Sequence, residues 1–292
     1  MRKSLTAIIL FAFIFSGCSK LKLAFNFLPW MLERQAKKYV GDLNSEQSAK
    51  LEAEVKEYVS WLRSDMMPTY SIALRLLADG LGSTTTSKAA ELLAPAAMNG
   101  IYAATVEPLY RPSAELLLSL DEKQLKDLEA SLKKRTDEDR KNYLDETKLP
   151  FETRMKRLQK GVEDWFGPLE KDQVTQLRGL AADFPMPYDA WIKDREERAA
   201  ELLLMLREKK ARREIEAHLR DWWTKARAAS RRKEDYQWDD TQLKKFTLGL
   251  LNMLNTKQKS YCASTLLGYA SQIDEIATIQ PEPQPKPTAP AN

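Results

Sequence analysis

Apolar residues recur at helical spacing along most of the chain. The clearest run is Phe151, Met155, Leu158, Val162 and Trp165, with alternate steps of four and three residues. This period places all five side chains on one face of an α-helix. Alternation of apolar and polar residues, which marks a half-buried strand, is nearly absent. The pattern predicts an all-α fold, a multi-helix bundle of about eight to ten amphipathic helices.

Other stripes of the same kind predict further helices within 44–62, 121–141, 239–253 and 255–276. No Gly or Pro occurs from Asp189 to Lys233. Since a single helix longer than about 25 residues is unusual, two helices joined near Lys209–Arg213 are expected there. The mixed charges of 133–141 indicate a solvated helix face.

Prolines predict where helices are broken. Pro68 is expected to interrupt a helix that resumes from Tyr70 to Leu81, and Pro108 and Pro112 are expected to bracket a turn. Residues near 86–107 are predicted to be helical between these breaks. The Pro-rich tail at 280–292 cannot build a core and is expected to be disordered or extended.

A Leu-x-x-x-Gln element occurs four times, ending at Gln47, Gln124, Gln173 and Gln258, and Asn or Asp follows the Leu in three copies. An Asn or Asp at this position caps a helix, and a Gln at the third helical position can reach back to the capping residue. We therefore interpret the four Gln residues as helix-start residues rather than ligands for a substrate. Their long, short, long spacing suggests a duplication of the helical domain, 29–279, with halves 29–167 and 168–279.

The N-terminus has the form of a secretion signal. Arg2 and Lys3 precede an apolar run, Leu5–Phe15, that is too short to span a bilayer. Ser16-Gly17-Cys18 follows and resembles the lipobox of bacterial lipoproteins, with Phe15 where Leu is usual. The resemblance implies that residues 1–17 are a signal peptide and that Cys18 is lipidated.

By resemblance to sorted lipoproteins, Ser19 after the Cys favours the outer membrane, with the body of the protein on the periplasmic face. The lipid-anchored segment 18–28 and the residues up to Met31 are apolar and aromatic. This stretch either lies in the membrane interface or leads into a first helix, from about Pro29 to Val40, that packs on the body. Packing is favoured because few cations flank the segment.

Composition excludes several kinds of chemistry. The formal charge of +4 gives no argument for nucleic-acid binding. The chain has one His, His218, and two Cys, Cys18 and Cys262. This inventory excludes most chemistry that needs several soft metal ligands or a His-based triad. We expect no cofactor and no metal, a satisfied or exposed His218, and a buried, unreactive Cys262 on the apolar stripe of its helix.

Two functions remain open on these grounds. The favoured one is a non-catalytic binding or structural role in the cell envelope, with an envelope protein as a possible partner, because long amphipathic helices offer grooves for partner segments. The alternative is a peptidoglycan-acting hydrolase that uses acidic residues such as Glu163 and Asp164.

Short motifs occur in a set order along the chain: Phe25-Asn26, Trp30, Tyr39-Val40, Asp42 to Gln47, Trp61-Leu62-Arg63, Met67 to Tyr70, Arg154, Trp165 to Gly167 and Leu169 to Gln173. Together they resemble a family of uncharacterised Gram-negative lipoproteins, the domain-of-unknown-function family numbered 6279. The resemblance implies an all-helical periplasmic lipoprotein and supplies no activity. Leu62 stands where the family usually has His, so any role of that His would be missing here.

Overall fold

The computed structural model describes residues 19–82, 89, 93, 95–148, 151–182, 188–225 and 240–278. All regular structure in these residues is helical, which confirms the all-α prediction. The expected signal peptide, Cys18 and the Pro-rich tail lie outside the described residues. Within the described chain, no helix is long and apolar enough to cross a bilayer.

The helices are α2 (Ser19–Asn26), α3 (Leu28–Val40), α4 (Ser45–Trp61), α5 (Met67–Gly82), α7 (Pro95–Val106), α8 (Tyr110–Leu118), α9 (Glu122–Lys148), α10 (Phe151–Phe166), α11 (Lys171–Ala182), α12 (Tyr188–Arg207), α13 (Arg212–Arg220), α14 (Asp240–Met253) and α15 (Thr256–Thr278). Short 3-10 and π turns occur at Glu107–Leu109, Leu62–Met66 and Asp221–Lys225.

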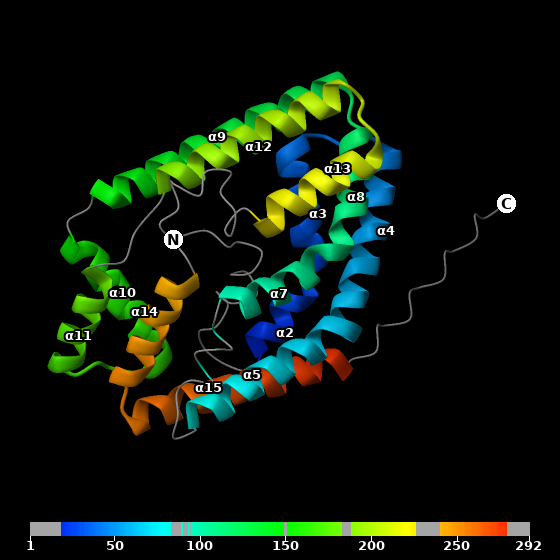
Figure 1. Ribbon diagram of the computed structural model, residues 1–292. Coiled ribbons are helices and arrows are strands. Elements are labelled where there is room, and N and C mark those ends of the chain that lie inside the picture. The colour runs from blue at the N-terminus through cyan, green and yellow to red at the C-terminus, as the bar shows by residue number, and fades with distance from the viewer. Residues whose placement is uncertain are drawn as a thin grey trace.

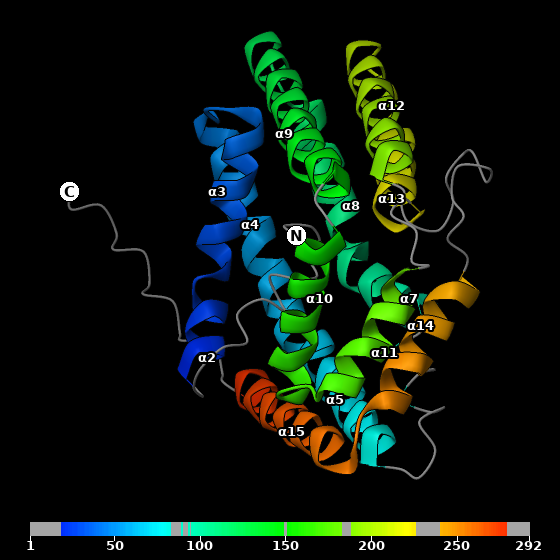
Figure 2. The same cartoon turned by 90° about the vertical axis from the view of Figure 1, so that its left-hand side faces the viewer.

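The helices are arranged as a frame, with α9 and α12 along one side and α5 and α15 along the opposite side (Figure 1). Helices α3, α4, α8 and α13 form one end of the frame, and α10, α11 and α14 form the other (Figures 1 and 2). Helices from the two expected halves pack against each other, since α15 of the second half lies along α5 of the first.

The pair α5–α15 is antiparallel and closes the lower side of the frame in Figure 1. Near the end of α5, Leu81 shares an apolar cluster with Cys262 at the start of α15. At the other end, Met67 clusters with Ile273 and Ile276. The apolar stripe predicted for α15 is therefore buried along most of its length.

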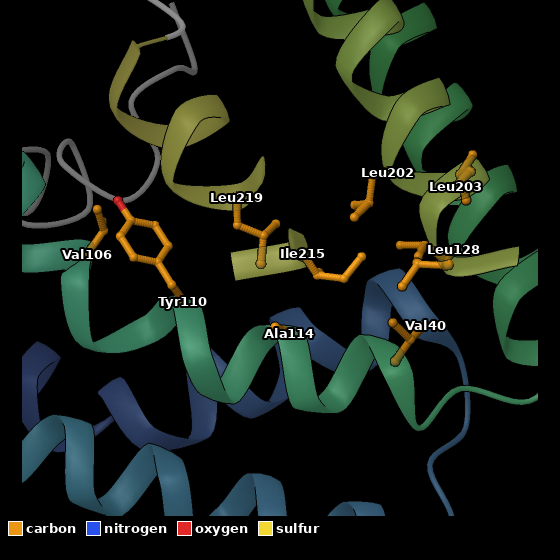
Figure 3. Close-up of a cluster of buried hydrophobic side chains, with 10 residues drawn as sticks. Val40, Val106, Tyr110, Ala114, Leu128, Leu202, Leu203, Ile215 and Leu219 are labelled. Atoms are coloured by element: carbon orange, nitrogen blue, oxygen red, sulfur yellow. The ribbon is translucent and has the colours of Figure 1, made fainter. Parts of the chain in front are cut away.

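A second core lies where α3, α7, α8, α9, α12 and α13 meet (Figure 3). Tyr110, Ile215 and Leu202 are among its buried side chains, and all three face the same interior in Figure 3. The side chains at i and i+4 on α13, Ile215 and Leu219, are both buried. Burial of one face on each helix is what the apolar stripes predicted.

Two proline predictions were wrong. The chain stays helical through Pro68, because the π turn Leu62–Met66 shifts the hydrogen bonding: the Met67 N–H donates to the Leu62 carbonyl, and no bond is needed from Pro68. Pro112 lies in the first turn of α8 rather than bracketing a turn. A proline is tolerated there because the first N–H groups of a helix have no intrahelical partner.

The break expected near Lys209–Arg213 is confirmed. Helix α12 ends at Arg207 and α13 begins at Arg212. Lys209 adopts a left-handed conformation, with a φ of 52°, that ends the first helix. The prediction of a helix near 86–107 holds for Pro95–Val106, and most of its first part lies outside the described residues.

Candidate functional site

The described helices surround a cavity of about 1300 Å³. Its wall is mostly apolar and is built by nearly all of the helices, α11 and α14 excepted. Representative lining residues are Leu28, Leu32, Val55, Leu77, Ile101 and Leu266. Protein interiors pack as densely as organic crystals and seldom leave voids much larger than one water molecule. A cavity of this size is therefore larger than an ordinary packing defect.

The charged residues of the wall are confined to one side of the cavity. They come from α3, α4, α9 and α12 and comprise Lys38, Lys50, Glu54, Lys134, Arg135, Glu138 and Arg195. The parts of the wall built by α5, α7, α10 and α15 carry no charged side chain. In Figure 1 these two groups of helices include opposite sides of the frame. The cavity thus has a charged side and an apolar side.

Two cations on the charged side have no ion-pair partner among the described residues. Within the described part of the chain, neither Lys38 nor Lys134 lies within ion-pair distance of a carboxylate. The two helices that carry them touch, since the Ser131 hydroxyl donates to the Lys38 carbonyl at 3.3 Å. Lys50, in contrast, is paired with Glu115 at 2.6 Å. Lys38 and Lys134 thus add positive charge to this side without a neutralising ion pair within the described residues.

Asp139 forms ion pairs with the two arginines of this side, Arg135 and Arg195. Its carboxylate lies 3.5 Å from Arg135 on the same helix and 3.2 Å from Arg195 on α12. Asp139 and the nearby Thr136 are buried. The prediction that residues 133–141 form a solvated face is therefore wrong at these two positions. The helix period exposes most of that run but turns these two side chains toward α12.

Polar groups in the wall where α4, α5 and α7 meet satisfy one another. The Tyr58 hydroxyl donates to the Thr105 carbonyl at 3.2 Å, and Tyr70 and Thr105 share a hydrogen bond of 2.5 Å between their hydroxyls. Burial raises the pKa of both tyrosines, so both remain neutral at physiological pH. This part of the wall makes no demand for a polar ligand.

The four glutamines of the Leu-x-x-x-Gln elements form two buried pairs, and Gln47 of the first pair also lines the cavity. In the first glutamine pair, Gln47 and Gln124, each side-chain amide donates to the other's carbonyl oxygen, at 3.0 and 2.8 Å. Each amide also donates to a backbone carbonyl before the partner's helix, Ser119 for Gln47 and Asp42 for Gln124. Each Gln oxygen also accepts from the backbone N–H of its own capping residue. Every hydrogen-bonding position of the two amides is therefore filled.

The second glutamine pair, Gln173 and Gln258, repeats this arrangement. The reciprocal amide hydrogen bonds measure 2.7 and 2.9 Å. The remaining amide donors reach the carbonyls of Met253 and Pro168, each at 2.8 Å. The helix-start interpretation of all four glutamines is confirmed, but the pairing across helices was not predicted. The sequence gives no local signal for it, because the partners are 77 and 85 residues apart.

A buried ion cluster lies between α12 and the π turn after α13. The Arg198 guanidinium is 1% exposed and donates to Asp194 at 2.9 Å and to Asp221 at 2.6 Å. Burial alone would lower the pKa of Arg198, but hydrogen bonds to Asp221 and Asp194 raise it above its ordinary value. Sequence reasoning missed this cluster, because nothing local distinguishes Arg198 from the exposed arginines around it. Its groups are satisfied within the protein, which favours a structural role.

His218 and Cys262 lie as predicted. His218 Nε2 lies 3.0 Å from the Arg198 carbonyl, and its ring meets Trp222 edge to face, so it is a satisfied, largely buried side chain. Cys262 is buried, and its burial raises the pKa of the thiol to about 12. A thiol with that pKa is unreactive at neutral pH. Within the described residues, no group of acidic, His and Cys side chains is arranged to hold a metal ion.

The acidic candidates for hydrolysis, Glu163 and Asp164, lie near the end of α10. Glu163 accepts from Gln159 at 2.8 Å, and Asp164 is paired with Lys160 at 3.1 Å on the same helix. Neither carboxylate lines the cavity, although Trp165 and Phe166 after them do. Within the described residues, each of the two carboxylates is thus engaged by a side chain of its own helix.

Leu62, at the position where the resembled family has His, is 1% exposed and packs in the core of α4, α5 and α15. The described basic residues near the α12–α13 break, Lys209 and Lys210, are exposed, as expected of a solvated face. Arg212 is paired with Glu216 at 2.5 Å. Arg231, Arg232 and Lys233 lie outside the described residues.

Comparison with known proteins gives one match. A family model described as a family of unknown function, DUF6279, matches residues 38–237. No curated protein and no solved structure matches the chain. The matched region includes the first glutamine pair, Gln173 and the charged side of the cavity, whereas Gln258 and most of α2 and α3 lie outside it. The chain belongs to the DUF6279 family of unknown function.

Proposed function

We propose that this protein is a non-catalytic binding protein of the bacterial envelope, tethered to the outer membrane through Cys18, that holds an amphiphilic lipid in its central cavity. The observation that carries the proposal is the cavity of about 1300 Å³ with its apolar wall. Pockets for ordinary small molecules measure about 300–1,000 Å³. Long acyl chains are a ligand class that suits a larger, mostly apolar space.

The distribution of charge in the wall selects the kind of amphiphile. Acyl chains would lie against α5, α7 and α15, where the lining carries no charge. An anionic headgroup would lie against Lys38 and Lys134, which have no carboxylate partner within the described chain. Each buried methylene contributes about 0.8 kcal/mol to binding, so the chains supply most of the affinity and the lysines supply headgroup preference.

A lipid anchor at Cys18 would hold such a protein at the outer membrane, next to the lipids that it is proposed to bind. The anchor rests on the lipobox-like Ser16-Gly17-Cys18. Lipidation is tested by mass spectrometry of the protein and of Cys18→Ala, combined with membrane fractionation. An unlipidated wild type, together with a variant that still sediments with membranes, would remove the anchor from the proposal.

The ligand is tested by titrating the purified protein with a fluorescent fatty acid. Ala73→Trp adds volume to the cavity wall and should weaken binding at least about tenfold by occupying space that the chain needs. Ala53→Trp, on an exposed position of α4 outside the cavity wall, is the matched control and should bind normally. Equal binding by the two variants would refute cavity binding.

The headgroup preference is tested with the same fatty acid and its neutral alcohol analogue. The double substitution Lys38→Gln and Lys134→Gln should weaken binding of the acid and leave the alcohol unaffected. Lys126→Gln, at an exposed position on the same α9 helix, is the control. Extraction of lipids from protein purified out of membranes then identifies the natural ligand.

The hydrolase alternative gains no support from the geometry at Glu163 and Asp164. It is still decided by experiment, because purified protein can be incubated with peptidoglycan sacculi. Release of soluble muropeptides by the protein, abolished by Glu163→Gln, would replace the binding proposal with a catalytic one.

A further inference from the structure

An apolar stripe is exposed on the first helices of the described chain. Leu23, Phe27 and Trp30 are 55%, 54% and 55% exposed. They are spaced as i, i+4 and i+7, and helical hydrogen bonds run across the junction of α2 and α3, from Phe27 N–H to Leu23 and from Met31 N–H to Phe27. The three side chains therefore lie in one line along one face.

The opposite face of the same helices is packed on the protein. Phe25 is 6% exposed, and Leu21, Leu28 and Leu32 pack against the cluster formed with α4, α5 and α15. The exposed stripe is thus not the result of a detached segment. One face of these helices packs on the body, as the sequence predicted. The other face is exposed, so it remains free to contact a membrane interface.

Cations continue the line of the stripe. Arg34 lies i+4 from Trp30, with its guanidinium 5.0 Å from the centre of the Trp30 ring, and Lys37 follows at the next position on this face. Both are exposed. Residues 19–40 contain five Lys or Arg and one Glu in total. An apolar line followed by cations is complementary to a bilayer with anionic headgroups.

We propose that the face formed by Leu23, Phe27, Trp30, Arg34 and Lys37 lies in the interface of a membrane that contains anionic phospholipid. The apolar side chains enter the boundary between headgroups and acyl chains, where Trp is favoured, and the cations contact the phosphates. This contact fixes the orientation of the frame on the membrane, which a flexible lipid tether alone does not do. The inference is independent of the cavity ligand.

The position of the stripe supports this occupant over a protein partner. Leu23 follows closely after Cys18, the residue expected to carry the lipid, so a tethered protein would present this face to the bilayer first. Membrane binding by the stripe can be measured separately from that of the lipid. The chain from residue 18 onward carrying Cys18→Ser has no acyl group and reports only the contribution of the helices.

The test is co-sedimentation of this chain with vesicles of phosphatidylcholine alone or with about one third phosphatidylglycerol. Binding is expected on the anionic vesicles, and high salt should weaken it because the Debye length falls to about 3 Å at 1 M. The triple substitution of Leu23, Phe27 and Trp30 by Ser should reduce partitioning at least about tenfold. Arg34→Gln with Lys37→Gln should remove the preference for anionic vesicles.

The matched control is a triple substitution by Ser at Ile72, Leu204 and Tyr261, which are 58%, 55% and 54% exposed on other helices. It removes a similar exposed apolar area and should leave vesicle binding unchanged. Circular dichroism shows whether each variant keeps its helical fold. Equal loss in both triple variants, or no vesicle binding by the parent chain, would overturn the proposal. Self-association in solution that only the Leu23, Phe27 and Trp30 substitutions abolish, without vesicle binding, would assign the stripe to a second copy instead.

Discussion

The two glutamine pairs have the same hydrogen bonds between their amides but differ at the capping residues. In the first pair both helices have a short capping side chain: Asn44 accepts from the Gln47 N–H at 2.9 Å, and Asp121 accepts from the Gln124 N–H at 2.8 Å. In the second pair only Asn255 caps in this way, at 2.9 Å from the Gln258 N–H. The fourth capping position is held by Glu170.

Glu170 uses its side chain differently. Its backbone N–H donates to Gln173 as in the other copies, at 2.9 Å, but its carboxylate accepts from the Asn255 side chain at 3.3 Å. The extra methylene of Glu carries the carboxylate past the first-turn N–H groups that a shorter Asp would reach. The shared amide pair therefore does not require a complete capping box, and the two features can be separated by mutation.

The largest effect is expected from removing one amide of a pair. Gln124→Ala leaves the buried Gln47 amide and the Asp42 carbonyl without their partner, and should cost about 3 kcal/mol of unfolding free energy. Gln173→Ala should cost a similar amount if the two pairs are equivalent. Chemical denaturation measures both, with exposed Lys123→Ala as the control.

A double-mutant cycle sharpens this result. Gln47→Ala combined with Gln124→Ala should cost clearly less than the sum of the single changes, because each single change already breaks the pair. Gln47→Ala combined with Gln258→Ala should be additive. Additive behaviour within the first pair would show that the reciprocal amide bonds do not contribute as a unit.

An intermediate effect is expected at the caps. Asp121→Ala should cost about 1 kcal/mol, as the loss of a helix-capping side chain does. Glu170→Ala should cost less, because no capping bond is lost, and Glu170→Asp should stabilise the second pair's helix by restoring a cap. Midpoints of urea unfolding at unchanged slope decide the order. A larger loss for Glu170→Ala than for Asp121→Ala would contradict the structural comparison.

The smallest effect concerns charge beside the first pair. Glu115 on α8 is 2.6 Å from Lys50 of α4 and 2.9 Å from Arg111, and hydrogen bonds to these two residues lower its pKa to about 2. Because the folded pKa lies below the ordinary 4.5, the ionised carboxylate stabilises the fold above that pH, and the contribution is lost as pH falls toward 2. Glu115→Gln should therefore destabilise at pH 7 and have progressively less effect as the pH approaches 2. A difference in stability that stays constant over this range would exclude the ionised carboxylate as its source.

Local patterns predicted the helices and their starts well. The spacing of apolar residues located α10 and α15. The Leu-x-x-x-Gln elements, three of them with Asn or Asp after the Leu, located helix N-termini, because capping involves only residues within one turn. Proline was less informative: Pro68 was expected to interrupt a helix and Pro112 to bracket a turn, but a π turn and a first-turn position accommodate them within helices. Such tolerance depends on backbone geometry that single residues do not encode.

The candidate site was not predictable in the same way. A cavity is the space left between faces of many helices, and the residues that line it have the same apolar pattern as core residues. The pairing of Gln47 with Gln124, and the burial of Arg198 between two aspartates, also depend on contacts far apart in the sequence. Sequence periodicity gives the direction of a side chain from its helix but not what lies opposite it.

The glutamine pairs also bear on the order in which the chain folds. Each pair joins helix starts far apart in sequence, separated by 77 residues in the first pair and by 85 in the second. During synthesis from the N-terminus, the first pair can close once Gln124 has been made, whereas Gln173 obtains its partner amide only with Gln258, in the first turn of α15. Contacts between distant residues form slowly because of the chain entropy lost in closing the loop. The first pair can therefore form while the C-terminal third of the chain is still missing, whereas the second pair, which joins the starts of α11 and α15, can form only near the end of synthesis.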